Sequence, residues 1–186
     1  TEKGVVLAID GDPSSNLHLA LGLPLISTVG EVREEMLTAV KGGKFNPGMA
    51  KQDYIDLRIR ESVVESSGLD LLAMGRPEGP GCYCAANNMM RTIIDRLENN
   101  YDFVVIDNEA GMEHISRQTT RDVNILLIIS DPSLRGIITA VRTKDLIKEL
   151  RTQVERIALI INRADGQLSP EAQRAIGESG LELLAT

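Results

Sequence analysis

The chain is predicted to fold as an α/β protein with a doubly wound, mostly parallel sheet, and recurring apolar runs are the first reason. These runs lie at Gly4–Ile9, Leu69–Met74, Phe103–Ile106, Ile125–Ile129 and Ile157–Ile161, with a possible sixth at Leu181–Leu184. Their Val, Ile and Leu residues are continuous instead of alternating with polar ones. Continuous runs are typical of strands that are buried on both faces of a sheet.

Segments with helical periodicity lie between these runs and are the second reason. Apolar residues recur at intervals of three and four in Thr28–Lys41, Gln52–Ser66, Ala85–Asn99 and Gly136–Leu150. Strands that alternate with helices predict right-handed crossovers between parallel strands. The glycine-rich stretch Gly42–Gly48 is predicted to be a loop.

Length and composition limit the classes of protein. A chain of 186 residues fits one domain, residues 1–186, with a sizeable core. The net charge of −7 and the 3% aromatic content argue against binding to nucleic acid. No apolar run reaches the roughly 20 residues of a membrane span and no signal peptide opens the chain, so we expect a cytoplasmic protein. Because Thr1 directly precedes one predicted strand and Thr186 directly follows another, we expect both ends to be truncated.

The two cysteines of the chain, Cys82 and Cys84, are separated by one residue. Two thiolates at this spacing are half of a metal site, since Zn²⁺ prefers four ligands in structural sites and nickel also binds thiolate. The remaining ligands would come from elsewhere in the fold or from a second copy of the chain. A disulfide between them would close a small, strained ring. Redox chemistry and burial as two small hydrophobic residues are further alternatives.

Polar residues follow four of the predicted strands at their carboxyl ends. They are Asp10 and Asp12, Asp107-Asn108-Glu109, Ser130-Asp131 and Asn162-Arg163. In open α/β sheets, ligands bind outside the carboxyl ends of the strands. Carboxylates and amides there are groups that hold Mg²⁺ or a nucleotide. The sequence therefore predicts a nucleotide or magnesium site at this edge of the sheet.

Three stretches of the chain together resemble a known family. They are VLAIDGDPSSNLHLALGLP from Val6, GPGCYCAANN from Gly79 and VVIDNEAGMEHISRQT from Val104. In these stretches the chain is similar to the accessory ATPases that mature nickel-containing carbon monoxide dehydrogenase, a branch of the ParA/MinD-type P-loop ATPases. The first and third stretches are typical of the wider class, and Cys-x-Cys belongs to the nickel-handling branch. The resemblance implies a P-loop NTPase-like fold and an ATP-dependent metallochaperone.

The resemblance also implies roles for the residues at the ends of the first and third strands. Asp12 matches the switch I aspartate that orients or activates the attacking water, and Asp107 matches the Walker B acid that holds the hydration shell of Mg²⁺. Asp10 matches a position that often stabilises the loop. Asn16 lies near the magnesium and phosphate side of switch I. Gly111 matches the switch II glycine near the γ-phosphate.

Three further residues take roles from the same resemblance. Asn162 matches the asparagine that recognises the nucleotide base. Cys82 and Cys84 match paired thiols that form a four-thiolate site for Ni²⁺ or Zn²⁺ across the two-fold axis of a homodimer. The implied partners are a second copy of the chain and carbon monoxide dehydrogenase or a related nickel enzyme.

The phosphate-binding loop of this class is missing from the sequence. Members of the class open with a strand, a G-K-G-G-x-G-K-[ST] loop and a helix, all ahead of the strand that starts here at Gly4. The string Lys41-Gly42-Gly43-Lys44 follows a predicted helix, and Phe45 replaces the Ser or Thr that would bind Mg²⁺. We therefore expect a gap in the sheet. We also expect poor nucleotide affinity and no measurable ATPase activity from these 186 residues.

Two other functions compete with the ATP-driven metallochaperone. One is a metal-binding protein without nucleotide hydrolysis, which the missing loop favours. The other is a partitioning or positioning ATPase of the ParA/MinD type. That function calls for a basic DNA-binding surface or an amphipathic membrane helix, and the sequence shows neither.

Overall fold

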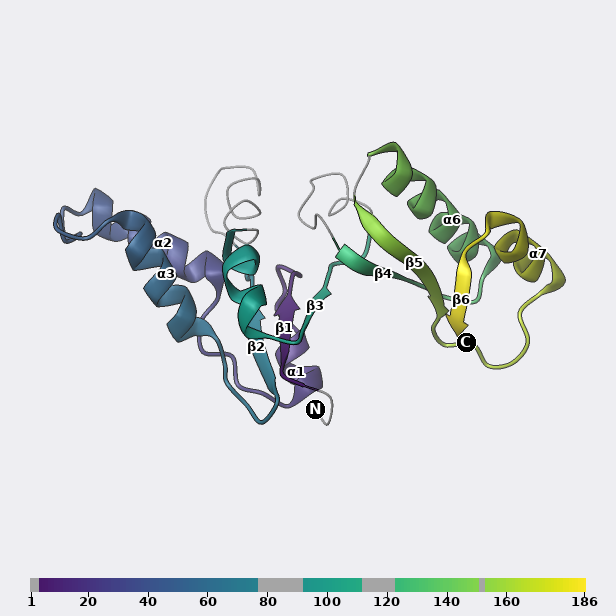
Figure 1. The fold of residues 1–186 in the computed structure, drawn as a ribbon, viewed down its shortest axis with the longest axis horizontal. Helices are drawn as coiled ribbons and strands as arrows, with labels where there is room; N and C mark the ends of the chain where they lie inside the picture. The colour runs from purple at the N-terminus through teal and green to yellow at the C-terminus, as the bar shows by residue number, and fades with distance from the viewer. Residues whose placement is uncertain (1–3, 77–91, 112–122, 151–152) are drawn as a thin grey trace. The chain divides into compact units, whose positions relative to one another are not determined.

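The computed structural model describes residues 4–76, 92–111, 123–150 and 153–186 of the chain. It divides into two compact units, Thr1–Gly111 and Met112–Thr186, and each unit is described by itself (Figure 1). The expectation of a single domain stays a prediction.

The first unit contains a three-stranded parallel sheet with the order β2-β1-β3. The strands are β1 (Val6–Asp10), β2 (Leu69–Ala73) and β3 (Phe103–Asp107). All three coincide with predicted apolar runs, so the parallel α/β prediction is confirmed. In the register, Asp10 lies opposite Ala73 on one side and opposite Asp107 on the other. The three carboxyl ends therefore meet at one edge of this sheet.

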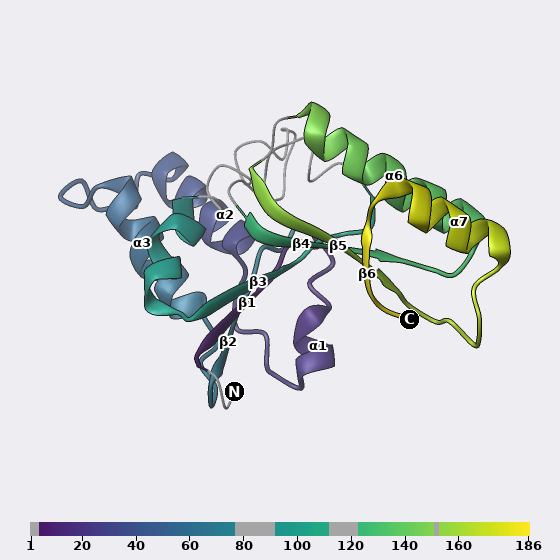
Figure 2. The ribbon, with the colours of Figure 1, turned by 45° about the vertical axis from the view of Figure 1, so that its right-hand side comes forward.

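Helices cover both faces of this sheet near β1 and β2. One face packs against α2 (Val29–Lys41), α3 (Lys51–Ser62) and the helical residues 92–97, which continue into the 3₁₀ helix η1 (Glu98–Asn100). The short helix α1 (Leu17–Leu21) packs on the other face (Figure 2). The main core consists of Leu7, Ile9, Val29, Val32, Met36, Ile55, Ile59, Leu72, Met74, Ile93 and Leu97.

The helices of this unit differ from the prediction in two places. The helix predicted over Gln52–Ser66 ends at Ser62, because Val64 adopts an extended conformation and exchanges backbone hydrogen bonds of 2.9 Å with Leu71. The helix α1 is not predicted, since five residues are too few for a periodic pattern. The helix predicted over Ala85–Asn99 lies partly outside the described residues, and its described end is helical.

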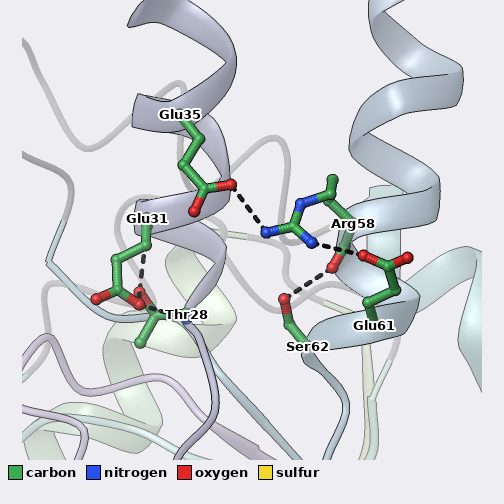
Figure 3. A network of polar contacts seen from close by, with 6 residues as sticks. All are labelled: Thr28, Glu31, Glu35, Arg58, Glu61 and Ser62. Carbon is green, nitrogen blue, oxygen red and sulfur yellow. Dashed lines mark hydrogen bonds and ion pairs between the residues drawn. The ribbon is translucent and has the colours of Figure 1, made fainter.

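A capping box fixes the start of α2 (Figure 3). The backbone N–H of Glu31 donates to Thr28 Oγ1 over 3.2 Å, and the backbone N–H of Thr28 donates to Glu31 Oε2 over 2.8 Å. These bonds satisfy two donors that a helix N-terminus would otherwise leave unpaired. The capping residue therefore determines where the chain turns from the loop into α2.

A polar network joins the outer surfaces of α2 and α3 (Figure 3). Arg58 of α3 donates to Glu35 of α2 over 2.9 Å and to Glu61 of its own helix over 2.6 Å. Ser62 Oγ donates to the carbonyl oxygen of Arg58 over 2.8 Å. The hydrogen bonds to Glu35 and then to Glu61 raise the pKa of Arg58 above its ordinary value. These exposed ion pairs orient the helix pair but contribute little stability.

The second unit contains a parallel sheet with the order β4-β5-β6. Its strands are β4 (Val123–Ser130), β5 (Val154–Ile161) and β6 (Glu182–Ala185), and all three are predicted by the sequence. The helices α6 (Leu134–Glu149) and α7 (Pro170–Ser179) pack on one face of this sheet (Figure 1). The second core lies between these helices and the sheet. It consists of Ile128, Ile137, Ala140, Leu159, Ile161, Ala172, Ile176 and Leu181.

The prediction of burial on both faces is wrong for β3 and β4. Alternate residues of β3 are exposed, and in β4 Ile125, Leu127 and Ile129 are about half exposed while Ile128 is buried. Among the described strands, β3 pairs only with β1 and β4 pairs only with β5. Each is thus an edge strand of its own three-stranded sheet.

Candidate functional site

The register of β1 and β3 brings together the two strand ends that carry the predicted catalytic residues. Asp10 and Asp107 are register partners at the ends of adjacent parallel strands. Just beyond them, the backbone N–H of Gly11 donates to the carbonyl oxygen of Asp107 over 2.7 Å. A Cβ on residue 11 would lie 3.0 Å from that oxygen, so glycine allows this close approach. The loop that starts at Gly11 is therefore held against the end of β3.

Asp10 organises this loop from within the fold. Its side chain is buried, with 1% of the residue exposed. Oδ1 accepts a hydrogen bond from the backbone N–H of Asp12 over 3.0 Å, and Oδ2 accepts one from Leu17 over 2.8 Å. A buried carboxylate needs such partners, and losing them would be costly. Because both oxygens of Asp10 accept loop amides, the geometry favours a positioning role over direct contact with a nucleotide.

Asp12 and Asn16 lie on the loop that Asp10 holds. Asp12 is half-buried, and its Oδ1 accepts a hydrogen bond from the backbone N–H of Ser14 over 2.8 Å. Asn16 is exposed and stands at the N-cap of α1 without a side-chain capping bond. Its amide is thus not used to start the helix. Both predicted residues keep polar groups near the carboxyl ends of the strands.

Ser15 is a residue of this loop that the sequence analysis missed. Ser15 is 7% exposed and has a φ of +50°. Within the described part of the chain, its Oγ has no hydrogen-bond partner. A buried hydroxyl without a partner is costly and marks a position that deserves an explanation. Nothing in the sequence distinguishes Ser15 from its exposed neighbour Ser14, because burial depends on how the loop closes.

Asp107 is exposed as a residue but lies in a negative environment. The partial burial of its carboxyl group, followed by the charges of Asp10 and Asp12, raises its pKa above the ordinary value. A cation at this edge would relieve the repulsion, and Mg²⁺ usually takes only one or two protein carboxylates together with water and phosphate. The residues present therefore fit a magnesium ion with Asp107 as its anchor. Gly111, with a φ of +118°, ends the described part of the same loop.

Asn162 belongs to the second unit and follows β5. Its backbone N–H donates to the carbonyl oxygen of Ser130 over 2.7 Å, so it lies beside the loop after β4. Its side-chain Oδ1 accepts a hydrogen bond from the backbone N–H of Arg163 over 2.9 Å. The side-chain NH₂ group takes no part in this bond. In the neighbouring loop, the hydroxyl and then the backbone N–H of Ser133 lower the pKa of Asp131. This polar strand end is a second site element in its own unit.

The predicted thiolate ligands Cys82 and Cys84 lie outside the described residues, so the four-thiolate site stays a prediction. Within residues 4–76, 92–111, 123–150 and 153–186, no three His, Cys, Asp or Glu side chains form a group that could hold a metal ion. The string Lys41 to Lys44 lies at the end of α2 and in the turn after it. The string therefore follows a helix instead of a strand, as predicted.

Comparison with known proteins gives the chain a family. No family model matches it. It is 44% identical over 179 residues to an ATP-binding protein of Methanocaldococcus jannaschii. The matched region covers 96% of this chain and 71% of the relative. This chain belongs to that family of ATP-binding proteins. It is also 32% identical over 160 residues to the carbon monoxide dehydrogenase accessory protein CooC of Rhodospirillum rubrum, covering 78% of the chain and 59% of CooC.

Solved structures agree on the fold of this ATP-binding family member. A ParA family ATPase from Chlorobium tepidum matches with a TM-score of 0.64 and 21% identity, covering 98% of this chain and 70% of that protein. The septum site-determining protein MinD of Pyrococcus horikoshii, in complex with Mg-ADP, matches with a TM-score of 0.58 and 16% identity over 97% of this chain and 67% of that one. The chain therefore has the α/β fold of the ParA/MinD P-loop NTPases. Of the helices in the described part, none is long and apolar enough to cross a membrane.

Proposed function

We propose that the full-length protein is an ATPase that acts as a maturation factor, helping to insert nickel into carbon monoxide dehydrogenase or a related nickel enzyme. The observation that carries the ATPase proposal is the β1–β3 register, which places Asp10 opposite Asp107 in an ATP-binding fold. The similarity to CooC supports the choice of carbon monoxide dehydrogenase, or a related nickel enzyme, as the recipient.

The residues of the site would divide the work of phosphoryl transfer. Asp107 would hold the hydration shell of Mg²⁺, which when bound neutralises charge on the phosphates. Asp12 would orient the attacking water and accept its proton, and Asp10 would hold Asp12 in place through the bond to its backbone N–H. Gly111 would approach the γ-phosphate. In the second unit, taken by itself, Asn162 would offer its amide to a nucleotide base. Reactions of this type depend on positioning and charge, which these groups supply.

The metal-handling half of the proposal rests on Cys82 and Cys84. One chain offers two thiolates, and a two-fold axis between two chains would bring together the four that a closed site requires. The cargo ion would be Ni²⁺ or Zn²⁺. Nucleotide-driven closure of the homodimer would then build or dissolve this site.

The ATPase proposal is tested with two variants of the full-length protein. Asp12→Asn should keep MgATP binding but lower kcat by about 10²-fold or more, because the water loses its proton acceptor. Asp107→Asn should weaken binding of ATP in the presence of Mg²⁺ and have little effect in its absence. Asp53→Asn, in the exposed first turn of α3, is the matched control and should behave as wild type. Unchanged turnover in Asp12→Asn would contradict its role.

The metal proposal has a separate test. Native mass spectrometry should find one metal ion per dimer. Cys82→Ala or Cys84→Ala should abolish this binding and weaken the dimer while circular dichroism stays unchanged. One ion held tightly per monomer would argue against a bridging site.

The competing function, a metal-binding protein without hydrolysis, makes a different prediction. The full-length protein would bind the metal but show no Mg²⁺-dependent ATP binding by calorimetry. For the 186-residue chain alone we expect poor ATP affinity, because it lacks the backbone N–H groups of a phosphate loop. Tight ATP binding by this chain would place the phosphate site elsewhere.

A further inference from the structure

The end of β2 forms a joint with β1 and with the start of α2. The joint consists of Thr28, Gly30, Met74 and Gly75. The backbone N–H of Met74 donates to the carbonyl oxygen of Asp10 over 2.8 Å, and its own carbonyl oxygen accepts from Gly30 over 2.9 Å. Thr28 forms a parallel bridge with Ala73. Met74, the residue directly after β2, thus connects the last residue of β1 to the first turn of α2.

Steric contact makes this joint tight. Gly75 has a φ of +67°, which favours glycine. A Cβ at residue 75 would overlap Oγ1 and Cβ of Thr28 and would lie 2.8 Å from its Cγ2. Thr28 cannot easily move away, because it is buried with 6% of the residue exposed and is held by the capping box with Glu31. Any side chain at 75 must therefore displace either Thr28 or the backbone around Met74.

The joint acts on the main chain of Asp10, and Asp10 in turn holds the loop. Its carboxylate oxygens accept the backbone N–H groups of Asp12 and Leu17. A displacement of Met74 would be passed to Asp10 through the 2.8 Å hydrogen bond and then to Asp12 through the 3.0 Å bond. Misplacing a catalytic group by about 1 Å costs on the order of 10²-fold in rate, so a shift of a few tenths of an ångström is enough to be measured.

We propose that Thr28 and Gly75 are positioning residues for ATP hydrolysis, which hold Asp12 in place through Met74 and Asp10. This inference rests on the proposed ATPase function. In the described residues, the Thr28 side chain bonds with Glu31 and makes no hydrogen bond to Asp10, Asp12 or Asp107, and Gly75 has no side chain. Both residues would therefore act through the main chain. Their replacement should change the rate of the chemical step more than the binding of MgATP.

The first test compares Gly75→Ala with Gly43→Ala in the full-length protein. Gly43 has a φ of +66°, nearly the same as Gly75, but a Cβ there would meet nothing within 4 Å. Both variants place alanine at nearly the same positive φ, and only Gly75→Ala adds the collision with Thr28. We expect kcat to fall about 5- to 20-fold in Gly75→Ala with KM for MgATP within about twofold of wild type, and Gly43→Ala to keep wild-type kcat.

A second pair of variants tests the joint from the side of α2 and does not add volume. Thr28→Val keeps the shape of the side chain but removes the hydroxyl that accepts from Glu31, and it should lower kcat about threefold or more. Thr28→Ser restores the hydroxyl and should retain a rate close to wild type. If Gly75→Ala does not fold, this pair alone decides the proposal.

The outcomes separate this inference from the ATPase proposal. If the wild-type protein hydrolyses ATP and Asp12→Asn stops it, while Gly75→Ala and Thr28→Val keep wild-type kcat, the joint has no positioning role. A rise in KM without a fall in kcat would also overturn it. If the wild-type protein does not hydrolyse ATP, the ATPase proposal itself fails, and this inference with it.

Discussion

The strands β1 and β4 look alike in sequence, but their surroundings differ. Both are continuous apolar runs, VLAID in β1 and VNILLIIS in β4. In the first unit, β1 is central and four of its five residues are buried, because helices cover both faces of the sheet. In the second unit, α6 and α7 cover one face, and alternate residues of β4 are exposed on the other.

This difference shows that a continuous apolar run indicates which side chains of a strand are suited to burial. It does not report what covers the strand, since that depends on segments elsewhere in the chain. The hydrophobic stabilisation of each residue follows the apolar area that is actually removed from water, at about 25 cal/mol per Å². Equal residues in β1 and β4 should therefore contribute unequally to stability.

The largest expected effect comes from one substitution made in both strands. Ile9 of β1 is 0% exposed, and Ile129 of β4 is 56% exposed. Ile9→Ala should lower the free energy of unfolding by about 3 to 4 kcal/mol, because it leaves a cavity in the core. Ile129→Ala should cost below about 1 kcal/mol. Urea denaturation of both variants checks this, and equal costs would mean that a covering layer buries Ile129.

A smaller difference is expected between the helix caps of the two units. Thr28 forms a capping box at α2 and is buried, whereas the Ser133 hydroxyl at α6 accepts one bond, from Gly136, over 3.0 Å. Thr28→Ala should destabilise by about 1 to 2 kcal/mol and Ser133→Ala by about 0.5 to 1 kcal/mol. Hydrogen exchange of the first-turn amides in each helix would measure both. A larger loss at Ser133 would reverse the expected order.

The smallest effect is a pH dependence confined to the first unit. Burial, and then the hydrogen bond to Asp70, raise the pKa of Tyr101 to about 12. Its hydroxyl donates to Asp70 Oδ2 over 2.9 Å and can do so only when protonated. Since the folded pKa lies above the unfolded value of about 10, this contribution is present below pH 10 and is lost as pH rises towards 12.

Replacing Tyr101 tests this contribution directly. Tyr101→Phe should be less stable than wild type at neutral pH, and the gap should narrow between about pH 10 and 12. Urea denaturation at several pH values measures it, and other groups that titrate in this range cancel in the comparison. A gap that stays constant with pH would show that folding does not raise the pKa of the Tyr101 hydroxyl.

The sequence predicts the strands well because each one is a short apolar run between polar turns. It also predicts that Asp10 and Asp107 share an edge, because the carboxyl ends of neighbouring parallel strands meet there. The helix α7 is missed although its signals are present: Ser169 at the N-cap, Pro170 at the first position and Gly180 at the end. Those signals could have located it without any periodicity.

Other features depend on tertiary packing and are beyond a reading of the sequence. The two hydrogen bonds accepted by Asp10 depend on how the loop of Asp12 folds back on it. The buried hydroxyl of Ser15 depends on the same closure. The exposure of Ile129 depends on which segments cover the sheet, and a strand's own residues carry no information about that.

The pairing of β1 with β3 has one more consequence, for the tolerance of this site to sequence change. The alignment of Asp10 with Asp107 is set by main-chain ladder bonds, and these do not depend on which apolar residues fill the strands. Substitutions among Val, Ile and Leu at the inner strand positions should therefore leave the alignment of Asp10 with Asp107 unchanged. Inserting or deleting a single residue within Phe103–Asp107 would instead turn the carboxylate to the opposite side of the sheet. The site can survive many exchanges of side chain but no change in the length of this strand.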